Sequence, residues 1–233
     1  MKGKIIYLFL LVSNLTFSQN VPQFKLNDIP FGKTENEVLS MLTGANVKYE
    51  NEGINVGDFC GNRTIRNYFV GGIYSIMGHG AFFNNDITKK VIVTYDGWEN
   101  IESIDLYFTK TFNKNDYTLF LVEKMMKSQK GNHATIMKSL VNSVSKIMGK
   151  PALIETSKYI DTDEYSTDSK LAAWDLGTKK VFLLTVNYIF SIEPMYVYVS
   201  KSGLSKYKRS CVLYKNAIKR EQEKKSEKSI DDF

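Results

Sequence analysis

The order of helix-like and strand-like segments constrains the fold of this chain more than any single motif does. Amphipathic helices are predicted at residues 34–44, at 132–149 and from 205 onward, with strand-like runs between them. Short turns connect these runs, which favours antiparallel pairing. The sequence therefore predicts an α+β fold, in which helices pack on antiparallel sheet. The blocks 24–115 and 116–203 could be two degenerate helix-plus-strands units, followed by a C-terminal helix.

The first two helices carry recognisable end signals. Thr34 and Glu37 have the spacing of a capping box, and Gly44 is a C-terminal stop. Asn132 can cap the second helix, which ends at Gly149. The apolar stripe predicted for the second helix consists of Ile136, Leu140, Val144 and Ile147.

The predicted strands are rich in β-branched and aromatic residues. They are residues 68–76, 91–95, 102–108, 153–159, 171–176, 181–190 and 195–200. The dipeptides Asp96-Gly97 and Gly177-Thr178 are turn signals, so each predicts a hairpin between its flanking strands.

Three segments give a weaker local pattern. Residues 117–126 are strand-like in their first half and helix-like in their second. Residues 45–62 are rich in Gly, Asn and charged residues, and they are predicted to form a long loop. Residues 161–169 are acidic and rich in Ser and Thr, so they too are predicted to form a loop.

The N-terminus has the layout of a secretory signal peptide. Lys2 and Lys4 precede an apolar run at 5–12, and a mostly polar segment follows at 13–19. The apolar run is shorter than the roughly 18 residues that a membrane-spanning helix needs. We therefore expect cleavage near Gln19 and export to the periplasm or beyond the cell. The expected organisation is a signal peptide at 1–18, a globular domain at 19–203 and a helical charged tail at 204–233.

The basic charge of the chain is concentrated at its ends. The formal net charge is +6, of which the signal peptide supplies +2 and residues 206–233 supply +4. Residues 19–205 hold 20 basic and 20 acidic residues. A nucleic-acid-binding protein is expected to carry a basic patch on its folded body. The balanced body and the predicted export both argue against nucleic acid as a partner.

The chain has two cysteines, Cys60 and Cys211. In an oxidising compartment an even number of cysteines favours a disulfide, and two buried thiols are the alternative. Cys211 lies on the apolar stripe predicted for the tail helix, together with Tyr207, Tyr214 and Ile218. A Cys60–Cys211 bridge would tie this helix to the first half of the domain.

Several short stretches resemble uncharacterised secreted proteins of Bacteroidota. They are PFGKTENEVLSMLTG, SVSKIMGKPALIE, AAWDLGTKKVFLL and the signal-peptide ending FSQN. The helix-then-sheet order is similar to the small fold of outer-membrane assembly lipoproteins and of the β-lactamase-inhibitor protein. That resemblance implies protein binding and no catalytic residues. The signal region has no cysteine to carry a lipid, so membrane anchoring is not implied.

The residues offer few candidates for catalysis or metal binding. Cys60 and His79 could form a nucleophile–base pair, although the disulfide competes for the same sulfur. The other histidine, His133, lies beside a predicted helix start. The acidic residues at 161–164 and Asp168 could supply oxygen ligands to calcium, but they lack the order of a calcium loop, and a solvated loop is the commoner outcome.

Aromatic residues suggest a binding surface. Tyr196 and Tyr198 share one face of a predicted strand, and with Trp98 they could contact a ligand or a protein. A core role is the alternative, and it is favoured for Trp174. If both faces of the 195–200 strand are apolar, that strand lies in a covered sheet.

Together these features favour an exported, non-enzymatic domain that binds another protein or an envelope component. The alternatives are an exported hydrolase with an unrecognised active site and a small-molecule or lipid-binding protein. No cofactor, metal ion, nucleic acid or transmembrane anchor is expected.

Overall fold

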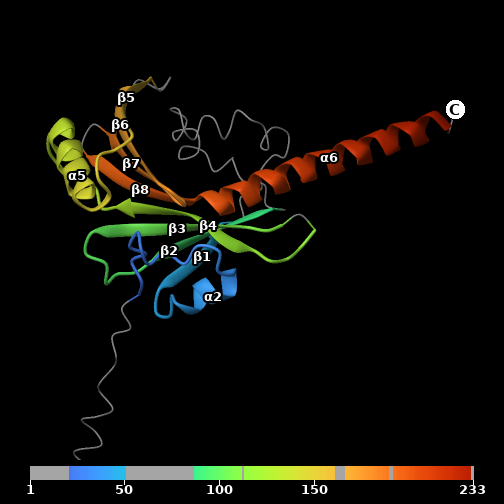
Figure 1. Ribbon diagram of the computed structural model, residues 1–233, viewed down its shortest axis with the longest axis horizontal. Helices are drawn as coiled ribbons and strands as arrows, with labels where there is room; N and C mark the ends of the chain where they lie inside the picture. Colours follow the sequence, from blue (N-terminus) through green and yellow to red (C-terminus); the bar gives the residue numbers. More distant parts are fainter. Residues whose placement is uncertain (1–20, 51–86, 112, 161–165, 189–190, 232–233) are drawn as a thin grey trace, which may run out of the picture.

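The computed structural model describes residues 21–50, 87–111, 113–160, 166–188 and 191–231, which form an antiparallel eight-stranded sheet and three helices (Figure 1). The strand order is β1-β2-β3-β4-β8-β7-β6-β5. The helices are α2 (Glu35–Ser40), α5 (His133–Met148) and α6 (Lys201–Asp231). The strands are β1 (Asn46–Glu50), β2 (Thr88–Thr94), β3 (Ile101–Thr109), β4 (Thr118–Met126), β5 (Leu153–Ile160), β6 (Ser166–Leu176), β7 (Lys179–Asn187) and β8 (Ile192–Ser200). The predicted α+β class is confirmed.

The sheet consists of two four-stranded meanders that meet at β4 and β8. Strands β1 to β4 follow α2, and strands β5 to β8 follow α5. The meanders join through antiparallel pairing, with Val122 opposite Tyr198 and Lys124 opposite Tyr196. This grouping places β4 with the first helix, whereas a boundary at 115/116 assigns β4 to the second unit. A duplication of the two units stays a prediction.

The predicted N-terminal cap of α2 and the two predicted hairpin turns are present in the structure. The Thr34 amide donates to Glu37 Oε2 at 2.8 Å, while the Glu37 amide donates to Thr34 Oγ1 at 3.4 Å. These two bonds form the capping box of α2. The Asp96-Gly97 turn joins β2 to β3. Gly177, at a φ of +71°, lies in the turn between β6 and β7, so both predicted hairpins are confirmed.

The buried face of α5 differs from the predicted stripe. Ile147 is 76% exposed, whereas Met137 and Val144 are 4% and 7% exposed. Met148, next to Ile147, is half-buried against the core instead. Helix α5 carries apolar residues on more than one face, and its contacts with β6 and β7 determine which face is buried.

Three segments are strands where the local pattern predicts otherwise. Residues 118–126 form β4 throughout, although their second half is helix-like. The predicted loop at 45–62 begins with the edge strand β1, which pairs with β2. Residues 166–169 of the predicted acidic loop belong to β6, between β5 and β7. In each case pairing with a distant strand supplies the backbone hydrogen bonds and overrides a weak local preference.

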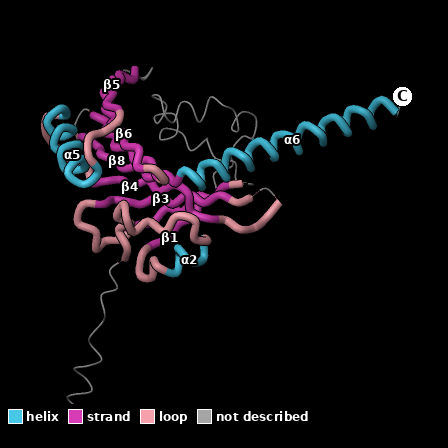
Figure 2. Tube along the Cα trace, viewed as in Figure 1, coloured by secondary structure: helices cyan, strands magenta, loops and turns pink. Residues whose placement is uncertain are grey.

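Both faces of the sheet are covered. Val38 of α2 and Val144 of α5 belong to one hydrophobic cluster, which also includes Trp174 and Tyr198. Tyr207 and Cys211 of α6 pack in a second cluster on the opposite face, with strand residues such as Val197. Figure 2 shows α2 and α6 on opposite sides of the strands.

Strand β8 is buried on both faces, since Val197 is 0% and Tyr198 is 6% exposed, which confirms the predicted covered sheet. Among the described residues no helix combines the length and the apolar character needed to cross a membrane. The predicted strand at 68–76 lies outside the described residues, as does the predicted signal peptide.

Candidate functional site

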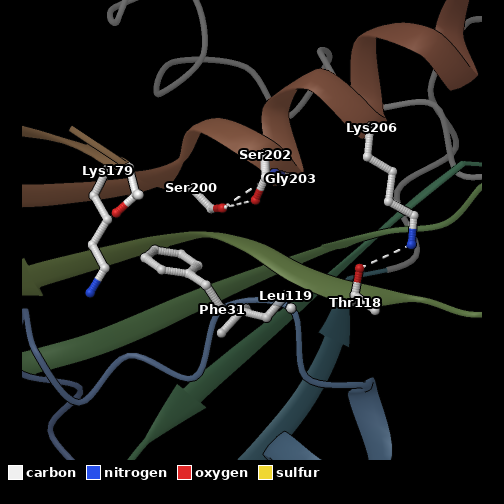
Figure 3. Close-up of a pocket in the computed structure, with 10 residues that line it drawn as sticks. Phe31, Thr118, Leu119, Lys179, Ser200, Ser202, Gly203 and Lys206 are labelled. Carbon is white, nitrogen blue, oxygen red and sulfur yellow. Dashed lines mark hydrogen bonds between the residues drawn. The ribbon is translucent and has the colours of Figure 1, made fainter.

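A cavity of about 370 Å³ lies where α6 leaves the sheet (Figure 3). We call it the α6-base pocket. Its lining residues are Phe31, Gly32, Thr118, Leu119, Thr178, Lys179, Ser200, Ser202, Gly203 and Lys206. They come from the segment before α2, from β4, from the β6–β7 turn and the first residue of β7, from the last residue of β8 and from the start of α6. The pocket therefore forms only when both meanders and α6 come together.

The first turn of α6 is closely packed against β4 beside this pocket. A Cβ atom on Gly203 would lie 2.4 Å from the Cβ of Phe120, so only glycine fits without a shift. The Gly203 amide donates to Ser200 Oγ at 3.2 Å, and the Lys201 amide donates to the Thr178 carbonyl at 3.0 Å. These two amides of the helix start therefore already have protein acceptors.

Two lysines lie at opposite sides of the α6-base pocket (Figure 3). Lys179 Nζ donates to the Leu26 carbonyl at 3.0 Å and lies 5.8 Å from the Phe31 ring centre. Lys206 Nζ donates to Thr118 Oγ1 at 3.1 Å and lies 3.4 Å from Asp116 Oδ2. The pocket thus offers hydroxyl groups and ammonium groups that are already hydrogen-bonded.

The carboxylate of Asp116 is held in its charged form. Burial alone would raise the pKa of Asp116, but the Thr111 amide and the Lys206 ammonium outweigh that effect. The pKa therefore lies below its ordinary value. This ion pair neutralises one of the two lysines, so the pocket as a whole is weakly cationic.

Of the predicted aromatic surface, Tyr196 and Tyr198 lie together and Trp98 lies apart. The two tyrosine rings stack with centroids 6.3 Å apart and an interplanar angle of 15°. Trp98 is 2% exposed, and its Nε1 donates to the Val21 carbonyl at 3.2 Å. Trp98 and Tyr198 are buried and Tyr196 is half-buried, so in this structure they do not present an open aromatic surface. Their role in binding stays a prediction.

Lys124 is a buried lysine beside the stacked tyrosines. The sequence patterns did not point to this lysine as a site residue. It is 7% exposed, and its Nζ lies 5.6 Å from the Tyr198 ring centre. Burial, helped by the charge of nearby Lys25, lowers the pKa of Lys124 to about 8. A sequence signal was present, since Glu123-Lys124 interrupts the apolar residues of 119–126.

A polar network lies on the sheet face that α6 covers. Tyr107 Oη donates to Glu123 Oε2 at 2.8 Å, and both residues are buried. Beside them Lys90 Nζ lies 3.1 Å from Asp105 Oδ2 and 5.7 Å from the Tyr107 ring centre. The ion pair joins β2 to β3, and the Tyr107–Glu123 hydrogen bond joins β3 to β4.

The remaining predicted site residues do not assemble into one described site. Cys60, His79 and the acidic residues at 161–164 lie outside the described residues. His133 is 9% exposed at the start of α5, with Nε2 2.8 Å from Thr185 Oγ1. Asp168 lies within β6, opposite Lys158 and Asn187. Within the described part of the chain, no three His, Cys, Asp or Glu residues gather to hold a metal ion.

Of the two cysteines in the predicted disulfide, only Cys211 lies among the described residues. Cys211 is 3% exposed in α6, and it packs in the cluster that faces β4 and β8. Cys60 lies outside the described residues, and the structure contains no disulfide among the residues that it describes. The Cys60–Cys211 pairing stays a prediction.

Beyond Cys211, helix α6 extends away from the strands (Figure 1). Val212 and Leu213 are 55% and 41% exposed. Lys208 and Arg209, one turn earlier, are also exposed. Helix α6 therefore presents cationic and apolar side chains on the surface of the protein.

Searches against protein-family models, curated proteins and solved structures gave no match for this chain.

Proposed function

We propose that this protein is exported and acts without catalysis, by binding the acidic surface of another protein through α6. The observation that supports this proposal is the projection of α6 beyond the sheet. The helix has 31 residues, which corresponds to about 47 Å at 1.5 Å per residue. Its first turns carry the buried residues Tyr207 and Cys211, and Tyr214 packs against the same cluster, so a packed base holds a projecting helix.

The charge of α6 favours an acidic partner. Residues 201–218 contain five basic residues and no acidic residue. Lys201 and Lys206 pair with Asp175 and Asp116 of the sheet region. Within the described residues, Lys208 and Arg209 form no ion pair, so their charges are available to a partner. Complementary charge speeds association and selects among partners.

Exposed apolar side chains lie next to these cations. Val212 and Leu213 follow Lys208 and Arg209 by about one turn, so the four side chains form one surface, which we call the α6 docking patch. Arginine and apolar residues together are typical of the buried centre of protein interfaces. By contrast, residues 219–231 mix five basic with four acidic residues and are nearly neutral.

The location of the partner follows from the signal-peptide sequence at 1–18. Export places the mature chain in the periplasm or outside the cell, where we expect to find the partner.

In-cell crosslinking tests the proposal. A photoreactive residue replaces Asn216, and the crosslinked partner is identified in the producing cell. The variant Lys208→Glu/Arg209→Glu should reduce recovery of that partner by about tenfold or more, as expected for losing charged contacts at the centre of an interface.

The matched control is Lys224→Glu/Lys225→Glu, which makes the same charge change at exposed positions near the end of α6. It should leave recovery unchanged. Equal recovery by all three proteins, or equal loss in both variants, would contradict specific docking through this patch.

A further inference from the structure

Three polar side chains lie together on the sheet face that α2 and α5 cover, at the junction of the two meanders. Lys124 of β4 lies directly opposite Tyr196 of β8, and Tyr198 follows two residues along the same strand. Lys124 and Tyr198 are 7% and 6% exposed, and Tyr196 is half-buried. We call these three residues the Lys–Tyr cluster.

The charge of Lys124 has no counter-ion within the described part of the chain. Its Nζ donates to the Phe24 carbonyl at 3.1 Å, and the charged side chain that acts on its pKa is another cation, Lys25. The ring face of Tyr198 offsets part of the cost of burying this charge. A buried ammonium group ordinarily pairs with an anion, and among the described residues Lys124 has none.

Neither Tyr196 nor Tyr198 has a hydrogen-bond partner for its hydroxyl among the residues that the structure describes. Burial raises the pKa of both tyrosines, so each hydroxyl keeps its proton and remains a donor. Buried polar groups are nearly always hydrogen-bonded, and an exception calls for an unobserved partner.

A segment of the chain covers the cluster. Residues 21–31, which we call the N-terminal strap, are held by side-chain donors that reach backbone carbonyl oxygens. Trp98 Nε1 donates to Val21, Lys124 Nζ to Phe24 and Lys179 Nζ to Leu26.

The backbone of the strap is strained at Phe24, the residue whose carbonyl accepts the hydrogen bond from Lys124. Phe24 has a φ of +45°, a region that favours glycine over a bulky residue. The Phe24 carbonyl therefore occupies the acceptor position at Lys124 at a conformational cost, and a better acceptor can displace it.

We propose that the Lys–Tyr cluster is a binding site for a small carboxylate with an aromatic body, and that the N-terminal strap is its lid. The carboxylate takes the place of the Phe24 carbonyl at Lys124 and accepts a hydrogen bond from Tyr198. The aromatic body packs against the stacked tyrosine rings. One ammonium group matches the single charge of a carboxylate, whereas a phosphate would bring more charge than the cluster balances.

Ligand titration tests this site, with the chain from residue 19 to 233 and sodium benzoate as the probe. The readout is the NMR signals of the tyrosine rings. Benzoate should shift these signals saturably below about 10 mM, within the millimolar range of weak small-ligand binding. Benzyl alcohol, which lacks the charge, and inorganic phosphate should bind at least about tenfold more weakly.

Variants separate a binding site from a purely structural lysine. Lys124→Met should weaken benzoate binding by about tenfold or more, the loss expected for a hydrogen bond to a charged group. Lys138→Met, at an exposed position of α5, is the matched control and should bind like the wild type. Tyr198→Phe removes only one hydroxyl, so it serves as the decisive variant if Lys124→Met does not fold.

The proposal is overturned if benzoate causes no saturable shift in the wild type. It is also overturned if phosphate or benzyl alcohol binds as tightly as benzoate. Equal benzoate affinity of the wild type and Tyr198→Phe would likewise reject it. None of these outcomes bears on docking through α6, which uses other residues.

Discussion

Lys124 should make the stability of this protein rise with pH in the alkaline range. Burial and the nearby Lys25 lower its pKa from 10.5 to about 8 in the folded state. In the unfolded chain the ordinary value returns. Between the two values the unfolded state binds more protons than the folded state, so the free energy of unfolding increases with pH across this window. Well below pH 8 the lysine is charged in both states, so Lys124 adds no pH dependence to the free energy of unfolding there.

The size of the effect follows from the pKa shift. One pKa unit corresponds to about 1.36 kcal/mol, so a shift of about 2.5 units amounts to about 3.4 kcal/mol over the whole window. Between pH 7 and pH 9.5 the expected gain is about 2 kcal/mol. Lys124 is only 7% exposed, so solvent screening does not reduce this value substantially.

The assay is urea unfolding of the wild type and of Lys124→Met at pH 7 and at pH 9.5. The upper limit stays below the raised pKa values of Tyr196 and Tyr198, so neither tyrosine titrates in the folded protein. The free energy of unfolding of the wild type should rise by about 2 kcal/mol relative to that of Lys124→Met. Lys138→Met should follow the wild type. Parallel behaviour of wild type and Lys124→Met would refute the argument that Lys124 is buried as a charged group.

Three further predictions concern packing and capping. Gly203→Ala should lower the free energy of unfolding by about 1–3 kcal/mol in urea titration, because its Cβ meets Phe120; an unchanged value would contradict the close approach of α6 to β4. Val144→Ala should lower the free energy of unfolding by about 1–3 kcal/mol, whereas Ile147→Ala should change it by no more than about 0.5 kcal/mol. A larger loss for Ile147→Ala would instead support the buried stripe predicted from the sequence. Hydrogen bonds from the N-cap backbone amide and hydroxyl of α2 lower the pKa of Glu37 from 4.5 to about 2, so its contribution is present above pH 4.5 and lost as pH falls through about 2. Thermal unfolding of Glu37→Gln should therefore differ from the wild type at pH 7 and converge with it near pH 2, and a constant difference would contradict this.

Local sequence signals predicted the elements whose determinants lie close together in the chain. Thr34 and Glu37 are three residues apart, and the capping box that they form defines the start of α2. Gly177 lies between the two strands that it joins, so the turn and the hairpin come from adjacent residues. Tyr207 and Cys211 are one helical turn apart, and both are buried in α6 as their spacing predicts.

The candidate sites depend on contacts between distant residues, which local patterns do not encode. Lys124 and Tyr196 are 72 positions apart, and they meet because β4 pairs with β8. The α6-base pocket likewise needs Phe31, Thr118 and Lys206 from three separate segments. A lysine in a strand is ordinarily exposed, so only its neighbours across the sheet show that Lys124 is buried.

The sequence by itself determined the capped helix starts, the two hairpin turns, the α+β class and the position of the positive charge in the tail. Propensities, caps and turn residues act within a few positions, so they can be seen in the chain. Tertiary structure alone decided that the two meanders join at β4 and β8 and that α5 buries Val144 rather than Ile147. It also decided that the N-terminal strap covers Lys124, because Phe24 and Lys124 are far apart in the sequence and meet only in the folded chain.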